Sequence, residues 1–132
     1  MTGALPASLA VDWKNQATQM ELQVNYFSGT IPKEWCEFTE IVRLNLAENF
    51  FTGSLPTEIG NLGAGHLGDQ DSTLGLFLND NYLMEGPLPS EIGSLEELCK
   101  LRTDKNASLL CIQVMHFLAI ELTPFSLFLL PT

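Results

Sequence analysis

The strongest constraint on this chain is a pattern that returns at a fixed distance along it. Residues 41–62 read IVRLNLAENFFTGSLPTEIGNL, and the segment before them carries the same succession of apolar, Asn, Gly and Pro positions. Three landmarks of the two copies, each 24 residues apart, set the register: Asn25 and Asn49, Gly29 and Gly53, Pro32 and Pro56. A unit of this length cannot bury its own apolar face, so copies must stack against one another. The sequence therefore predicts a repeat solenoid.

The apolar positions of the two copies correspond one to one, and each pair is expected to meet in a shared core. Alternation around Leu44 and Leu46 has the period of a half-buried strand, with Arg43, Asn45 and Ala47 facing outward. Such strands are expected to pair in parallel from copy to copy. The predicted core residues are Ala17, Met20, Leu22, Phe27, Ile31, Trp35 and Phe38 in the first copy and Ile41, Leu44, Leu46, Phe51, Leu55, Ile59 and Leu62 in the second.

The spacing L-x-x-L-x-L-x-x-N-x-L, followed by G-x-[IL]-P-x-x-[IL]-G-x-L, resembles the leucine-rich repeat. Its G-x-[IL]-P element is similar to that of the plant-type subclass, which receptor-like proteins and receptor-like kinases carry. The resemblance implies an α/β leucine-rich-repeat solenoid of about four coils, with short parallel strands on a concave face. After the repeats we expect an irregular or helical apolar C-terminal tail.

We place the solenoid over residues 1–106 and the apolar tail over residues 107–132. The expected units are a partial coil at 3–16, coils at 17–40, 41–72 and 73–97, and an incomplete coil at 98–106. Asn81 lies 32 residues after Asn49, eight more than the regular step. Because Asn61 to Ser72 are rich in Gly and Asp, we expect the extra residues to form a surface loop there. A start inside a repeat suggests a truncated gene product or a piece of a longer array.

Asparagine recurs where each coil must turn, and its side chain can both donate to and accept from backbone groups there. We therefore expect a structural asparagine ladder with one residue per coil: Asn25, Asn49, Asn81 and Asn106. Two further sets have a backbone role, turn glycines and extended-segment prolines: Gly29, Gly53 and Gly86, and Pro32, Pro56 and Pro89. The sequence Asn106-Ala107-Ser108 also matches a glycosylation sequon, which we interpret as incidental because Asn106 holds the ladder position.

Charge and cysteine usage exclude several classes of function. Sixteen acidic against six basic residues give a formal net charge of −10, which disfavours binding to nucleic acid. The three cysteines are odd in number and lack the spacing of a zinc site. We therefore interpret Cys36, Cys99 and Cys111 as free, semi-buried thiols. The segment from Asp69 to Asp80 matches a calcium loop poorly. We expect no metal and no cofactor.

Few residues in the sequence are candidates for catalysis. His66 and His116 have no nearby nucleophile and carboxylate at a spacing that suggests a triad. Glu34, Glu58 and Glu91 each follow a proline by two residues, so they mark a repeated solvent-facing position and not an acid–base pair. We therefore expect that the chain is not an enzyme.

In the family that the chain resembles, outward-facing strand residues form the concave recognition surface. Carried over by position, the partner-binding residues are Gln19, Glu21, Gln23, Arg43, Asn45, Phe77, Asn79, Lys100 and Arg102. The rest of the same row is Val24, Ala47, Glu48, Gly75, Asp80, Asp104 and Lys105. Aromatic and arginine side chains are enriched at interfaces, so we expect Phe77, Arg43 and Arg102 to carry the partner contact. The alternative is ordinary solvated surface.

Residues 107–131 contain one formal charge, Glu121. The tail could cap the open end of the solenoid, anchor the chain in a membrane, or be a gene-model artefact. Glu121 and Pro124 count against a spanning helix. An anchor would hold the repeats in the cytoplasm, because the flanking positive charges lie on the repeat side. No secretion signal is visible, so we expect a membrane-associated or cytoplasmic chain, extracellular only if an N-terminal signal peptide has been lost.

Two functions fit the sequence. The favoured one is a non-enzymatic protein- or peptide-binding module of a receptor-like leucine-rich-repeat protein, with the partner held on the concave face. The alternative is a truncated ligand-sensing region of a receptor-like kinase whose kinase domain is missing from this chain. The repeat pattern indicates neither the identity of the partner nor the oligomeric state.

Overall fold

The computed structural model of the protein describes residues 1–66, 74–95 and 98–103. Outside this range lie residues 67–72 of the predicted loop, Asn106 and the apolar tail at 107–132. The cap, the membrane anchor and the gene-model artefact therefore remain open as alternatives for the tail. Within the described ranges, no helix combines the length and the apolar character needed to cross a bilayer.

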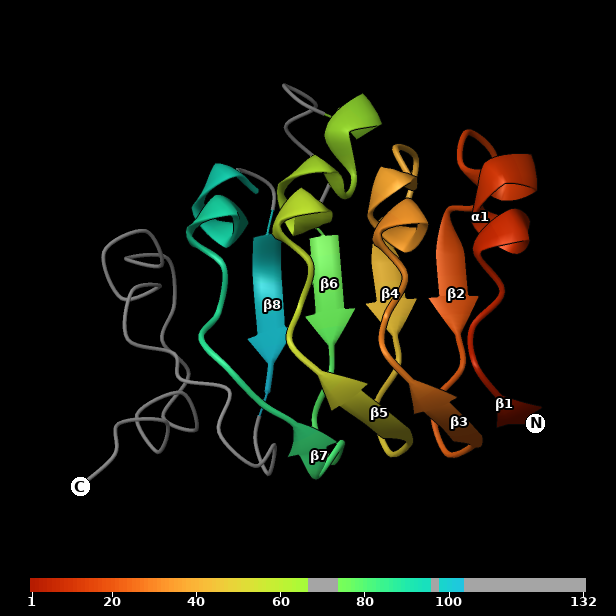
Figure 1. Ribbon diagram of the computed structural model, residues 1–132. Helices are drawn as coiled ribbons and strands as arrows, with labels where there is room; N and C mark the ends of the chain where they lie inside the picture. The colour runs from red at the N-terminus through yellow and green to blue at the C-terminus, as the bar shows by residue number, and fades with distance from the viewer. Residues whose placement is uncertain (67–73, 96–97, 104–132) are drawn as a thin grey trace.

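One strand of each coil contributes to a first, four-stranded parallel sheet with the order β2-β4-β6-β8. These strands are Gln19–Glu21 (β2), Arg43–Asn45 (β4), Leu74–Phe77 (β6) and Leu98–Arg102 (β8). Leu44 lies opposite Met20 on one side and Leu76 on the other. This register confirms the stacking that the repeat predicts, because equivalent positions of successive coils are side by side. Figure 1 shows the four strands in one row.

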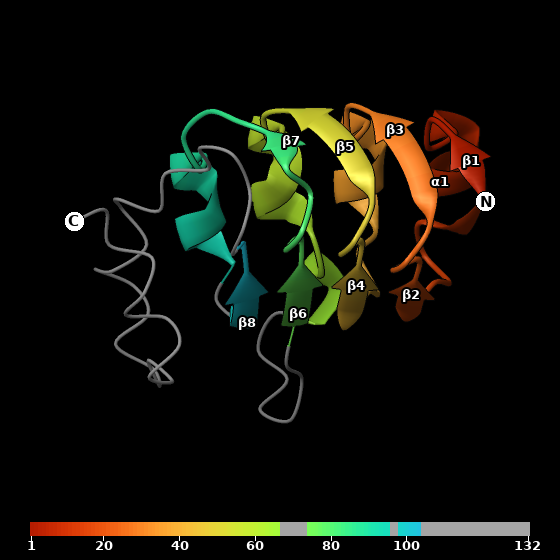
Figure 2. The same ribbon diagram turned by 90° about the horizontal axis from the view of Figure 1, so that it is seen from below.

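A second sheet has the order β1-β3-β5-β7 and is also parallel. Its strands are Thr2–Gly3 (β1), Tyr26–Gly29 (β3), Phe50–Gly53 (β5) and Leu83–Met84 (β7). Figure 2, seen from below, shows β3, β5 and β7 crossing the underside of the stack after β2, β4 and β6. Because β1 pairs with β3, the first residues of the chain already belong to the stack.

Helical turns form a row above the first sheet (Figure 1). They are the α-helix Ala7–Trp13 (α1) and the 3₁₀ helices Lys33–Glu37 (η1), Thr57–Asn61 (η2), Ala64–His66 (η3) and Ser90–Ser94 (η4). A proline precedes η1, η2 and η4, and the prolines before η1 and η2 are extended, as Pro56 is with φ −67° and ψ 149°. Its fixed φ suits a helix start, and its carbonyl accepts the first helical hydrogen bond, from Ile59 N at 3.1 Å in η2.

The core lies between the first sheet, the second sheet and the helical turns. Every predicted core residue of the second copy is buried, as are all those of the first copy except Met20 and Leu22, which are partly buried. These two are less covered because β2 is the end strand of the first sheet. Phe27 and Phe51 stack in the core with ring centroids 6.3 Å apart and planes 6° apart. Equivalent side chains of neighbouring coils therefore pack directly on each other.

The predicted turn glycines have the backbone angles expected of them. Gly29, Gly53 and Gly86 have φ values of +79°, +71° and +93°, a region that L-residues rarely adopt. The insert differs from the prediction of a surface loop starting at Asn61, because Asn61 ends η2 and Ala64–His66 form a further 3₁₀ turn. Backbone bonds hold this turn to the preceding coil, from Gly63 N to Phe38 O at 2.9 Å and from Gly65 N to Thr39 O at 2.8 Å.

Candidate functional site

The exposed face of the first sheet presents rows of side chains that run from coil to coil. One row contains Gln19, Arg43 and Gly75, and the next contains Glu21, Asn45 and Phe77. Short parallel strands in register bring residues far apart in the sequence to neighbouring positions. The face can therefore present side chains from three coils to a single partner.

Four of these side chains form one network, which we call the Arg43 cluster: Glu21, Arg43, Asn45 and Phe77. Arg43 makes an ion pair with Glu21 through Nε, and its guanidinium carbon lies 4.6 Å from the centroid of the Phe77 ring. Asn45 Nδ2 donates to Glu21 Oε2 at 3.1 Å. Both charged side chains remain partly exposed, at 42% for Arg43 and 38% for Glu21. The cluster is thus fixed in shape and still open to solvent.

Gly75 explains why the Phe77 ring can lie in the Arg43 cluster. A Cβ atom at position 75 would come within 2.9 Å of Phe77 Cε2. The missing side chain leaves space for the ring beside Arg43, which lies opposite Gly75 in the sheet. Glycine weakens a strand, and here its position matches a close approach of a neighbouring group.

At the turns that follow β4 and β6, a ladder asparagine connects its own coil to the preceding coil. Asn49 Oδ1 accepts from Phe27 N of the preceding coil at 3.1 Å, while its Nδ2 donates to Leu22 O at 2.9 Å. Asn81 repeats this one coil later, accepting from Phe51 N at 3.2 Å and donating to Leu46 O at 2.9 Å. These side chains satisfy backbone groups of two coils at once and are buried, so they are structural.

The residue before each of the three described ladder asparagines, Asn25, Asn49 and Asn81, has a strained backbone. Val24, Glu48 and Asp80 have φ values of 56°, 53° and 60°, in the left-handed region, although none is glycine. A β-branched residue such as Val24 is an outlier there. This conformation turns the chain out of the first sheet, and an exposed aromatic residue follows two positions later, after the ladder asparagine: Tyr26, Phe50 or Tyr82.

Cys36 is buried in η1, and the described part of the chain gives it no disulfide. Burial, together with smaller contributions from the carboxylates of Glu58, Glu34 and Glu37, raises the pKa of its thiol to about 12. Such a thiol stays protonated at neutral pH and is a poor nucleophile. Among the residues that the structure describes, no group of three His, Cys, Asp or Glu side chains could hold a metal ion.

A family model for the leucine-rich repeat matches residues 40–62. Two solved structures are similar in both fold and sequence. One is the leucine-rich-repeat ectodomain of the plant membrane receptor kinase GASSHO1/SCHENGEN3 from Arabidopsis thaliana, with TM-score 0.68 and 34% identity over 80% of this chain. The other is PEPR1–AtPEP1, with TM-score 0.66 and 31% identity over 79% of this chain. The chain is a leucine-rich-repeat protein of the plant type.

This leucine-rich-repeat chain covers only 11% of the first of those proteins and 13% of the second. A plant ice-binding protein has TM-score 0.61 at 18% identity, over 80% of this chain and 31% of its own, which shows likeness of fold alone. Comparison with curated proteins gave no match. Because one fold serves different activities, the function must be argued from the surface of this leucine-rich-repeat chain.

The structure separates the predicted partner-binding residues into three groups. Gln19, Glu21 and Arg43 are exposed or partly exposed, Gln23 is half-buried, and Phe77 is partly exposed within the Arg43 cluster. Asn45 and Asn79 are buried, with 8% and 7% of their surface exposed. For Lys100 and Arg102 the structure describes the backbone of β8, and their side chains lie outside the description.

The prediction that Asn45, Asn79 and Ala47 are accessible is therefore wrong. Asn45 lies between β2 and β6, and its Oδ1 accepts from Ala47 N at 3.3 Å. Asn79 Nδ2 donates to Asp80 Oδ2 at 2.8 Å. Each side chain bonds within the surface of the leucine-rich-repeat chain, so neither projects from it.

The aromatic row, which consists of the exposed residues Tyr26, Phe50 and Tyr82 on the underside of the stack, was not predicted from the sequence. Its signal was present, because an aromatic residue follows every described ladder asparagine, in Asn25-Tyr26, Asn49-Phe50 and Asn81-Tyr82. The repeat pattern assigns no role to this position. Only the structure shows that these aromatic side chains point outward, in contrast to the core residues Phe27 and Phe51 that follow two of them.

Proposed function

We propose that the chain is a non-enzymatic protein- or peptide-binding module of a receptor-like leucine-rich-repeat protein, and that its partner docks on the exposed face of the first sheet. The observation that carries this proposal is the Arg43 cluster. An arginine over an aromatic ring combines apolar contact area with hydrogen-bond donors, and such residues dominate the binding energy of protein interfaces. In this cluster they are held in position before any partner arrives.

Preorganisation strengthens the case for this face. Fixing a long arginine side chain on binding costs conformational entropy, and an arginine already fixed by Glu21 and Phe77 avoids most of that cost. The guanidinium group has five N–H donors, and Nε faces Glu21. Its terminal nitrogens can then donate to carbonyl or carboxylate oxygens of a partner. Gln19, exposed beside Arg43, adds a polar group at the edge.

The similar structures support a peptide or protein as partner. The GASSHO1/SCHENGEN3 ectodomain was solved in complex with CASPARIAN STRIP INTEGRITY FACTOR 2, and the second structure is PEPR1–AtPEP1. Both are more than 30% identical to this chain over the matched region. By analogy, the first sheet of this chain would hold a ligand of the same general class.

Selection of random peptides displayed on phage, with the immobilised full chain as bait, tests the proposal. Selected peptides are then titrated against Phe77→Ala and Arg43→Ala. We expect each variant to weaken binding about thirtyfold, which corresponds to the loss of about 2 kcal/mol that marks a hot-spot residue. The matched controls are Phe50→Ala, an exposed aromatic residue on the underside, and Lys33→Ala, an exposed basic residue on η1. Equal affinity for all four variants would overturn the assignment.

Gly75→Ala separates the placement of the ring from the presence of the ring. The added Cβ would displace the free end of the Phe77 side chain and leave the backbone in place. We expect weaker peptide binding by this variant with an unchanged thermal melting temperature. If Gly75→Ala binds the selected peptides like the parent chain, the ring position beside Arg43 does not matter for recognition.

The second candidate function is the ligand-sensing region of a receptor-like kinase whose kinase domain is missing from this chain. Its support is the 34% identity to the ectodomain of a plant membrane receptor kinase. Sequencing the transcript beyond both ends of the region that encodes this chain tests it. A glycine-rich loop and an HRD motif in the same reading frame would favour this candidate, and their absence would favour the binding module.

A further inference from the structure

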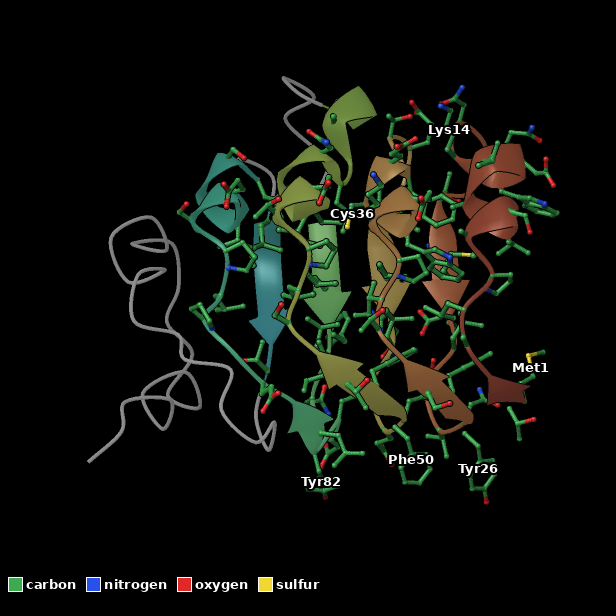
Figure 3. All side chains as sticks on the ribbon, in the orientation of Figure 1. Met1, Lys14, Tyr26, Cys36, Phe50 and Tyr82 are labelled. Atoms are coloured by element: carbon green, nitrogen blue, oxygen red, sulfur yellow. The ribbon has the colours of Figure 1, made fainter. Side chains whose placement is uncertain are left out.

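Three aromatic side chains are exposed on the underside of the stack, at the corner where the first sheet ends and the second begins. Tyr26, Phe50 and Tyr82 are 66%, 48% and 59% exposed. Figure 3 shows all three pointing away from the underside in a row. Tyr26 and Phe50 stack with ring centroids 6.0 Å apart and planes 13° apart. Exposed aromatic rings in three successive coils form an apolar surface that the fold does not need for its core.

The aromatic row forms one wall of an open cavity of about 290 Å³. The other wall contains the strained residues Val24, Glu48 and Asp80, and we call this cavity the underside groove. Since three successive coils each place one residue of each kind in it, the groove follows the axis of the stack. An elongated ligand would fit it better than a compact one.

The charged side chains that the structure describes in the underside groove are both acidic. They are Glu48 and Asp80, and none of the described lining residues is lysine or arginine. Asp80 already accepts from Tyr82 Oη at 3.2 Å, which fixes the orientation of that tyrosine. The net charge of the chain, −10, adds to the negative potential. A second copy of this acidic chain would be repelled, whereas a cationic segment would be attracted.

We propose that the underside groove binds a basic, extended segment of a partner protein through arginine side chains. Guanidinium groups stack on the open parts of the aromatic faces and pair with Glu48. The chain itself shows this chemistry on its other face, where Arg43 lies over Phe77. Arginine suits the groove better than lysine because its planar group combines stacking with directed hydrogen bonds.

The spacing of the rings predicts the pattern of the ligand. An extended chain advances about 3.3 Å per residue, so alternate side chains on one face repeat at about 6.6 Å. This matches the 6.0 Å between the rings of Tyr26 and Phe50. We therefore expect arginine at alternate positions in the bound segment. This binding is separate from the proposed function of the first sheet and does not depend on it.

Fluorescence anisotropy of the full chain with a labelled peptide of alternating arginine and glycine tests the proposal. The variants Phe50→Ser and Glu48→Gln change exposed side chains of the groove. We expect Phe50→Ser to weaken binding about threefold or more, the size of an exposed cation–π contact. Glu48→Gln should weaken it by about the same factor through the loss of an exposed ion pair. The matched controls are Trp13→Ser and Asp12→Asn on α1, which lies on the opposite side of the stack. These should leave the affinity unchanged.

Two further peptides complete the test. Replacing arginine by lysine should weaken binding, and so should grouping the same arginines into one block. Equal losses in the groove variants and in the α1 variants would overturn the proposal, because they would show general attraction to an acidic chain. Binding of cellohexaose that Phe50→Ser removes, with no effect on the arginine peptide, would overturn it in favour of a carbohydrate ligand. Phe77→Ala should have no effect in this assay, so failure here and failure of the proposed function are distinguishable.

Discussion

Individual side chains of the asparagine ladder supply hydrogen-bond partners to buried backbone groups. At the turn after β4, the buried amide of Phe27 has Asn49 Oδ1 as its acceptor, and three carbonyls receive bonds from Asn49 Nδ2. A buried N–H group without an acceptor loses its hydrogen bonds to water and gains none in the protein, which destabilises the folded state. The ladder therefore matters most where coils cover it on both sides.

Asn49→Ala is expected to lower the free energy of unfolding by about 1 to 3 kcal/mol, the cost of buried unsatisfied groups. Asn25→Ala is the matched control at the end of the stack, where Oδ1 accepts from the N-terminal amine of Met1 in an exposed position. It should cost clearly less. Urea denaturation of both variants measures the difference, and equal losses would contradict the ladder assignment.

At a strained residue we expect a substitution to raise the free energy of unfolding, in contrast to the loss expected at the ladder. Val24 has φ 56° and a side chain that is 67% exposed, so its conformation costs energy while its side chain contributes little to packing. Asparagine tolerates the left-handed region. Val24→Asn should therefore raise the free energy of unfolding by about 1 kcal/mol. The same substitution at the exposed helical residue Val11 should not stabilise the chain, and a loss of stability at position 24 would refute the reasoning.

Cys36 makes stability depend on pH at the alkaline end. The pKa of its thiol is raised from 9.0 to about 12 in the folded protein, chiefly by burial. Above pH 9 the unfolded chain releases this proton while the folded chain keeps it. Stability is therefore unaffected by Cys36 below pH 9 and falls as pH rises toward 12, by up to about 1.4 kcal/mol per pH unit.

Comparison with Cys36→Ala isolates this contribution, because other titrating groups are common to both proteins. The variant loses packing at every pH, but its stability should fall less steeply between pH 9 and pH 11. Urea denaturation at a series of pH values gives the two slopes. Parallel slopes would mean that the thiol ionises equally in the folded and unfolded states.

At the scale of the elements, the repeat predicts pairing and core contacts well. Apolar periodicity fixes which face of each strand is buried, and the 24-residue step fixes which residues of neighbouring coils meet. The turn glycines were also predictable, because a left-handed φ leaves a strong signal in the residue type. The same local signal fails for Val24, where a valine adopts that conformation.

Exposure was harder to predict than pairing. Alternation correctly places Asn45 on the outer side of its strand, but neighbouring strands and its own hydrogen bonds leave it only 8% exposed. The contact between Arg43 and Phe77 depends on the space above Gly75, which no pattern of apolar residues reports. Accessibility comes from several coils together, whereas periodicity describes one coil at a time.

Close packing between η2 and η4 gives a prediction at this scale. A Cβ at Gly60 would lie 2.6 Å from Ser94 Oγ and 2.8 Å from the backbone oxygen of Glu91. In an open helical position Gly→Ala stabilises, so destabilisation here would report the contact between coils. We expect Gly60→Ala to cost about 1 to 3 kcal/mol.

Adding Ser94→Ala to Gly60→Ala should recover only part of this cost, because the backbone oxygen remains in place. Urea denaturation of the single and double variants measures both effects. An increase in stability for Gly60→Ala would show that the two helical turns are farther apart than the structure places them.

For the whole molecule, the stack separates two surfaces of different chemistry. The first sheet presents mixed charges around Arg43, while the underside groove is aromatic and acidic. Both arise from the same repeat, since successive coils place equivalent residues on each surface. Under the two proposals, the chain would hold two partners at once, because the two surfaces lie on different sides of the stack (Figure 2).

We propose that recognition takes place on the first sheet, and hydrogen–deuterium exchange of the full chain, measured with and without a peptide selected on it, locates the bound surface. We expect slower exchange in segments 19–23, 43–47 and 74–79 when the peptide is bound, with no change in segments 33–37 and 57–61 of the helical side. The effect should disappear in Phe77→Ala at the same peptide concentration. Slower exchange confined to the helical side or to the underside segments 26–29 and 50–53 would contradict the claim.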